Sequence, residues 1–130
     1  MSTYRDVITQ AMQELGVLHV GETPSGDEGV DGLTRLNQLM TGLIYDGIDL
    51  EFQSVTNIDS DVPYPDDHIG AFASMLALEL TTLYGVTASQ EMVAKGLRGK
   101  RYLQNRYLKI PPATIDPAIR SYWNPNNRFV

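Results

Sequence analysis

The stretch from Gly21 to Leu50 constrains the fold more than any other part of the chain. Ser25 and Glu28 have the spacing of a capping box, in which each side chain satisfies the other residue's backbone N–H at the start of a helix. Gly47 is placed for a left-handed cap at the end of that helix. Between them, large apolar residues recur at three- and four-residue steps, as on one helix face: Val30, Leu33, Leu36, Met40, Leu43 and Ile44.

Asn37 is the one polar residue on or beside this apolar face. Buried polar side chains are nearly always hydrogen-bonded, so the favoured interpretation is a core asparagine satisfied by a backbone group. The alternative is a register-setting contact with another helix.

An N-terminal helix and an extended segment are predicted on either side of this helix. The first helix spans about 3–15 and ends at Gly16, with one apolar face made of Tyr4, Val7, Ile8, Ala11 and Leu15. After Gly47, residues 50–58 alternate in polarity, which predicts a short strand.

Two further helices are predicted in the second half of the chain. The third begins near Asp66 or Asp67 and ends at Gly85, and it is apolar nearly all round, which is typical of a central helix. Its main face is Ile69, Phe72, Ala73, Leu76, Leu80, Leu83 and Tyr84. Ser89 can cap a fourth helix that runs to about Leu108, with Met92, Val93, Gly96, Leu97 and Leu103 facing inward. Glycines within a helix cost about 1 kcal/mol each against alanine, so Gly96 and Gly99 indicate either close backbone packing or a helix that needs its neighbours for stability.

The sequence therefore predicts a mainly α protein. We expect a four-helix bundle over residues 1–109, with a short extended or β segment after the second helix, and an irregular C-terminal docking tail over residues 110–130. A chain of 130 residues fits one domain. There is no cysteine, so disulfides and thiolate metal sites are excluded. No apolar leader or membrane-length run is visible, so we expect a soluble protein without membrane contact.

Charge is divided unevenly along the chain. Residues 1–90 hold fourteen acidic and two basic residues, a formal charge of −12, whereas residues 91–130 hold two acidic and eight basic residues, a charge of +6. Such a division allows the acidic part of one copy to attract the basic part of another, or the basic helix to contact a phosphate backbone. A solvated basic helix is the plain alternative. The residues expected to make subunit or phosphate contacts are Lys95, Arg98, Arg101, Tyr102, Arg106 and Lys109.

The last segment, residues 110–130, contains four of the seven prolines and loses helical periodicity. It nevertheless keeps large apolar and aromatic residues, which suit docking along another protein better than a solvated linker. Folding back onto its own domain is the alternative. The predicted docking residues are Ile115, Ile119, Arg120, Tyr122, Trp123, Arg128 and Phe129.

Catalytic and metal-binding motifs are not evident. The two histidines, His19 and His68, lack the spacing of a helical zinc site, and Asp59 with Asp61 lacks the rest of a calcium loop. No nucleophile-elbow or phosphate-cradling glycine motif occurs. We therefore predict no catalytic residues, no metal and no cofactor. Because carboxylates are plentiful, a carboxylate-based cell-wall hydrolase is kept as a minor hypothesis.

Several segments, taken in order, carry a family resemblance. They are E-L-G-V (14–17), P-S-G-D-E-G-V-D-G-L-T-R-L-N-Q-L-M (24–40) and Y-D-G-I-D-L (45–50), followed by an apolar helix opened by D-D-H, a basic helix and an aromatic tail. Together they resemble the head-to-tail adaptor proteins of short-tailed bacteriophages, also called head-completion, neck or packaged-DNA stabilisation proteins. The resemblance covers nearly the full length. The two internal glycines of the fourth helix depart from it, and the last twenty residues match only in character.

The resemblance implies a non-enzymatic adaptor made in the host cytoplasm and located in the neck of the virion. Twelve copies would form a ring beneath the portal protein after DNA packaging, help retain the genome and present a platform for the tail or nozzle protein. The C-terminal tail would lie along the portal, and DNA would pass through the lumen without sequence-specific binding. The alternatives are a connector at another neck or tail position and a DNA-binding module that uses the basic helix.

Overall fold

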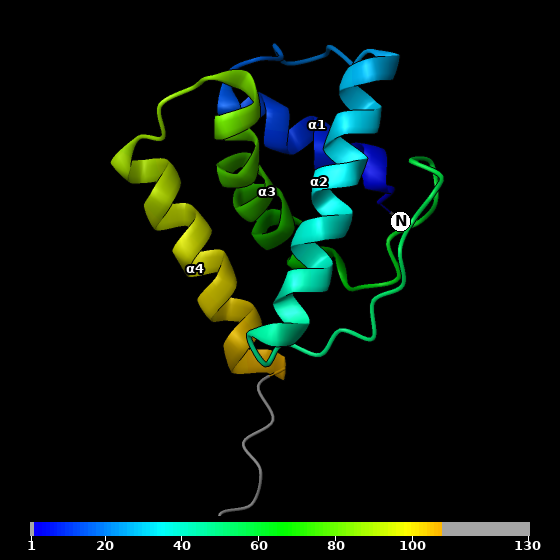
Figure 1. Cartoon of the computed structure of the whole chain (residues 1–130), viewed down its shortest axis with the longest axis vertical. Helices are drawn as coiled ribbons and strands as arrows, with labels where there is room; N and C mark the ends of the chain where they lie inside the picture. The colour runs from blue at the N-terminus through cyan, green and yellow to red at the C-terminus, as the bar shows by residue number, and fades with distance from the viewer. Residues whose placement is uncertain (1, 108–130) are drawn as a thin grey trace, which may run out of the picture.

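A computed structural model of the protein describes residues 2–107, which form a helical bundle (Figure 1). The helices are α1 (Tyr4–Leu15), α2 (Gly26–Tyr45), α3 (Ile69–Tyr84) and α4 (Gln90–Tyr107), and a 3-10 turn, η1 (Asp66–His68), runs directly into α3. The predicted mainly α, four-helix class is confirmed. The tail predictions fall on residues 108–130, outside the described residues.

Helix α3 lies at the centre of the bundle and packs against α1, α2 and α4. Its buried side chains come from most of its circumference, as its all-round apolar sequence predicts. The largest of the fully buried ones are Phe72, Leu76 and Leu80. Leu83 departs from the prediction, since 39% of its surface is exposed near the end of the helix. None of the helices within residues 2–107 has the length and apolar content needed to cross a membrane.

Local capping sets where the helices begin and end. The Ser25–Glu28 capping box is present, with both reciprocal hydrogen bonds at 3.2 Å. A second capping box, formed by Thr3 and Asp6, opens α1 and was not anticipated from the sequence. Gly16 and Gly47 adopt left-handed conformations, with φ values of 89° and 85°. The predicted helix ends are therefore confirmed, because these two positions need a residue without a Cβ.

The buried face of α2 differs from the predicted stripe. Val30 and Ile44 are 64% and 44% exposed, whereas Leu36, Met40 and Leu43 are buried together with Gly29 and Gly32. A Cβ on Gly32 would come within 2.6 Å of the Ile8 side chain, so this glycine allows α2 to approach α1. The prediction was wrong for Val30 and Ile44 because it followed the large side chains and ignored the glycine side of the helix.

The face of α4 that packs on α3 likewise has glycines, Gly96 and Gly99, at its closest contacts. A Cβ on Gly99 would lie 3.0 Å from the Ala71 Cα, and one on Gly96 would collide with the Leu78 side chain. The predicted close backbone packing is confirmed. Val93 and Leu97, which were expected to face inward, are 40% and 56% exposed. Contact through glycine turns these two larger side chains toward the rim of the interface.

The strand predicted over residues 50–58 does not form. No residue between 50 and 58 is β-paired, and an isolated bridge joins Thr3 and Asp61 elsewhere in the described residues. The segment is extended, but its half-buried residues recur at every third position, Phe52, Val55 and Ile58, instead of every second. A strand would need a partner strand for its backbone groups. Here a side chain replaces that partner: Asn37 both donates to and accepts from the backbone of Val55, at 2.9 Å each. The favoured interpretation of Asn37 is confirmed.

Candidate functional site

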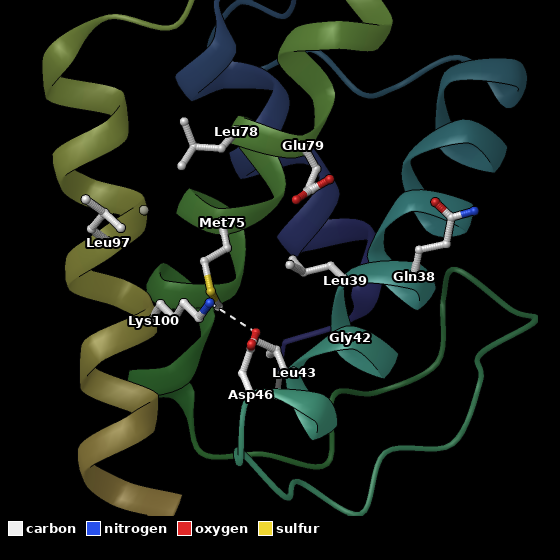
Figure 2. Close-up of a pocket in the computed structure, with 11 residues that line it drawn as sticks. Gln38, Leu39, Gly42, Leu43, Asp46, Met75, Leu78, Glu79, Leu97 and Lys100 are labelled. Atoms are coloured by element: carbon white, nitrogen blue, oxygen red, sulfur yellow. Dashed lines mark ion pairs between the residues drawn. The ribbon is translucent and has the colours of Figure 1, made fainter. Parts of the chain in front are cut away.

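A groove runs between α2 and α4 and has α3 as its floor (Figure 2). Both outer helices pack on α3 but make no extended contact with each other. The gap between them holds a cavity of about 300 Å³. Its apolar lining comes from all three helices: Leu39 and Leu43 from α2, Met75 and Leu78 from α3, and Leu97 from α4.

Charged groups mark one end and the floor of this groove. Lys100 of α4 forms an ion pair with Asp46, at the end of α2, with an Nζ–Oδ2 distance of 3.0 Å. Glu79 of α3 points into the gap in Figure 2 and is exposed. It makes no ion pair with any residue of the described part of the chain. The groove is therefore apolar with one acidic group that can accept a cationic partner.

The basic residues of α4 separate into two sets. Lys95, Arg98 and Arg101 are exposed and make no ion pairs within residues 2–107. Lys95 and Arg98 also line a shallow second cavity of about 320 Å³ on the α3–α4 surface. The subunit or phosphate contacts predicted for these three residues stay a prediction.

Tyr102 and Arg106 form the second set, and both contact Asp67 of the same domain. The Tyr102 hydroxyl donates to Asp67 Oδ2 at 2.6 Å, and Arg106 Nη1 lies 3.7 Å from the same oxygen. The Tyr102 ring is half-buried against His68. Lys109 and the seven predicted tail residues, which run from Ile115 to Phe129, lie outside the described residues.

Asp67 joins a polar network that the sequence analysis missed. His68 is fully buried, and its Nδ1 lies 2.8 Å from Asp67 Oδ1 while its Nε2 hydrogen-bonds the Tyr107 hydroxyl. The hydrogen bond from Tyr102, and then that from His68, hold the pKa of Asp67 below its usual 3.8. Ionised Asp67 can only accept, so Nδ1 carries the proton.

Aromatic rings enclose His68, whereas its partner Asp67 remains half-exposed. Tyr64, Phe72, Tyr102 and Tyr107 all have ring centroids within 6.4 Å of the His68 ring. An imidazole enclosed in this way has no approach for a substrate, so we assign the network a structural role that ties the last two turns of α4 to the start of α3. The D-D-H opening of α3 and the tyrosines of α4 were the only sequence signals for it.

Neither metal-binding geometry nor comparison with known proteins assigns a function to these residues. Within residues 2–107, His, Asp and Glu side chains nowhere form a group of three that could hold a metal ion. No protein-family model matches the sequence, and a search of curated proteins finds no relative. The candidate functional surfaces are therefore the groove and the exposed basic residues of α4.

Proposed function

We propose that this protein is a structural component of the neck of a short-tailed bacteriophage, a head-to-tail adaptor that works by binding and not by catalysis. In this role, a ring of twelve copies binds beneath the portal protein after DNA packaging. It helps to retain the genome and offers the tail or nozzle protein its attachment platform. The proposal starts from the ordered segments that resemble such adaptors.

The resembling segments coincide with positions that determine this fold. E-L-G-V contains the left-handed Gly16, P-S-G-D-E contains the Ser25–Glu28 capping box, and Y-D-G-I-D-L contains the left-handed Gly47 and the buried Ile48. These are places where a change of residue is costly for physical reasons. The likeness therefore concerns the architecture of the bundle, and this supports a scaffold of the adaptor type.

The observation that carries the binding function is the apolar surface on α2 and α4. Ile44, Tyr45, Val93 and Leu97 are each at least 40% exposed, and Leu97 adjoins the apolar groove. Val93 and Leu97 are four residues apart on α4 and so share one face, and neighbouring exposed apolar side chains mark contacts with other proteins more often than single exposed residues do. A ring closed by head-to-tail contacts would cover part of this surface in each copy.

Imaging tests this proposal directly. Portal rings mixed with the full chain are expected to gain ring-shaped density beneath the portal exit. A chain lacking residues 110–130 is expected to keep the helical circular-dichroism spectrum but fail to bind. Trp123→Ala should weaken binding more than Asn126→Ala, its matched control in the same segment. Portal rings that stay bare with the full chain would refute the adaptor function.

A DNA-binding module is the second candidate, favoured by the exposed Lys95, Arg98 and Arg101 on α4. Such residues can contact phosphates in a salt-dependent manner. A gel shift that is lost in the Arg98→Ala, Arg101→Ala double variant, and retained in Arg5→Ala, would support this candidate. Salt-independent migration, or no shift at low salt, would leave the adaptor as the better explanation.

A further inference from the structure

We propose that, in the unassembled protein, the chain's own C-terminal segment occupies the groove between α2 and α4, with Trp123 as its anchor. The occupant must be apolar, because Leu39, Met75, Leu78 and Leu97 supply the lining. With about 300 Å³, the groove lies at the lower limit of pockets that take compact organic groups, which run from about 300 to 1,000 Å³. One large aromatic side chain suits this space.

The lining favours an aromatic occupant over an aliphatic one. Met75 offers a thioether at the floor of the groove, and sulfur makes favourable contacts with aromatic rings. Tryptophan, tyrosine and arginine are also the side chains that most often anchor a segment in a pocket. Residues 108–130 contain Arg120, Tyr122 and Trp123 close together, and Trp123 is the chain's single tryptophan.

The charges of the groove and of residues 108–130 also favour this C-terminal segment as the occupant. Within the groove, Lys100 and Asp46 neutralise each other at 3.0 Å, so Glu79 supplies the remaining charge. Residues 2–107 carry fifteen acidic and seven basic residues, a formal charge of −8, whereas residues 108–130 carry one acidic and three basic residues, a charge of +2. The segment is thus attracted to the domain as a whole. Arg120, three positions before Trp123, is the cation closest in sequence to the anchor and is assigned to Glu79.

The length of the segment favours the chain's own domain over a second copy. Helix α4 ends at Tyr107, ten residues beyond Leu97, which is about 15 Å along the helix axis. The sixteen residues from Tyr107 to Trp123 can span about 50 Å, so Trp123 reaches its own groove with chain to spare. A tethered segment of this length acts at an effective concentration in the millimolar range, above that of a free second copy at ordinary protein concentrations.

The single tryptophan makes the proposal directly measurable in the isolated protein, without portal. We expect the fluorescence of Trp123 in the full chain to be blue-shifted and protected from acrylamide, relative to a peptide of residues 108–130. The shift should not depend on protein concentration. Leu97→Glu places a charge at an exposed groove position and is expected to return the emission to that of the peptide, with the helical circular dichroism unchanged.

Val30→Glu is the matched control, because Val30 is a comparably exposed apolar residue on α2 that lines a different cavity. It is expected to leave the emission unchanged. Glu79→Lys should shift the emission toward that of the peptide, and Arg120→Glu added to it should restore the protected state. Peptide-like emission from the full chain, a response to Val30→Glu but not to Leu97→Glu, or a blue shift that appears only as the protein dimerises would each overturn the proposal. Since portal binding is not measured, failure here leaves the adaptor function standing.

Discussion

The side-chain amide of Asn37 pairs with the backbone of Val55 in the manner of a neighbouring strand, donating to its carbonyl and accepting from its N–H, each at 2.9 Å. One residue of α2 thereby satisfies a peptide group in an extended segment that has no β-type partner along residues 50–58. This pair fixes the position of the connection between α2 and α3.

Asn37→Ala is therefore expected to lower the free energy of unfolding by about 1–3 kcal/mol, because both Val55 groups lose their partner. Asn37→Asp should cost more than Asn37→Ala, since a carboxylate would face the Val55 carbonyl. Urea unfolding gives both values. Gln38→Ala, at the exposed neighbouring position, should stay within about 0.5 kcal/mol of the unmodified protein. Equal costs at positions 37 and 38 would contradict the role given to the Asn37 amide.

Alanine substitutions at Gly99 of α4 and at Gly42 of α2 should change stability in opposite directions. A Cβ at Gly99 would meet the Cα and carbonyl oxygen of Ala71 at 3.0 and 3.1 Å, and backbone within the central helix cannot move aside alone. We expect Gly99→Ala to destabilise the protein by about 1–3 kcal/mol through overpacking. Gly42→Ala has nothing within 4 Å and should stabilise by up to about 1 kcal/mol through helix propensity. Thermal unfolding of the two variants in parallel is the measurement.

The loss of folding stability at acidic pH should depend on Asp67. Its pKa is lowered in the folded protein, chiefly by the Tyr102 hydroxyl and then by His68. The stabilisation is present above the unfolded-state pKa of about 3.9 and is lost as pH falls through the lower folded-state value. We expect Asp67→Asn to flatten the fall in stability below about pH 4, where Asp59, paired with Arg5, gives the remaining slope. An unaltered pH profile in Asp67→Asn would disprove the assignment.

Tyr84 should be replaceable by phenylalanine without loss. Its hydroxyl is enclosed but has no hydrogen-bond partner among the described residues, and burial raises its pKa. A buried polar group without a partner costs about 1–3 kcal/mol. We therefore expect Tyr84→Phe to keep or raise the melting temperature. Tyr64→Phe is the contrasting variant and should lower it, because the Tyr64 hydroxyl donates to the Leu50 carbonyl at 3.1 Å.

Helix existence and helix ends could be predicted from the sequence because their signals are local. Ser25, Glu28, Gly16 and Gly47 act on residues a few positions away, and the structure has them in the expected roles. The choice of buried face could not be predicted as well. On α2 and α4 it is decided by glycines that fit Ile8 and Ala71, which are residues of other helices.

The candidate site was predictable only in part, for the same reason. Exposed Lys95, Arg98 and Arg101 follow from helical spacing. The contacts of Tyr102 and Arg106 with Asp67 could not be predicted in this way. Tyr102 and Asp67 lie thirty-five residues apart in the sequence, and helical periodicity does not predict contacts at that separation. The groove could not be predicted either, because it forms only where α2 and α4 both pack on α3 without extended contact between them.

The contacts at the end of α4 determine how the domain would respond to a pulling force on its C-terminus. Tyr107, the last residue of the helix, and Tyr102 hold His68 and Asp67, two adjacent residues at the start of the central helix. Tension on the chain beyond Tyr107 would therefore load the Tyr107–His68 hydrogen bond first, and the Tyr102–Asp67 bond, five residues nearer the start of α4, only after it. A pull on the C-terminus is thus opposed by two successive attachments of α4 to the residues that precede the central helix.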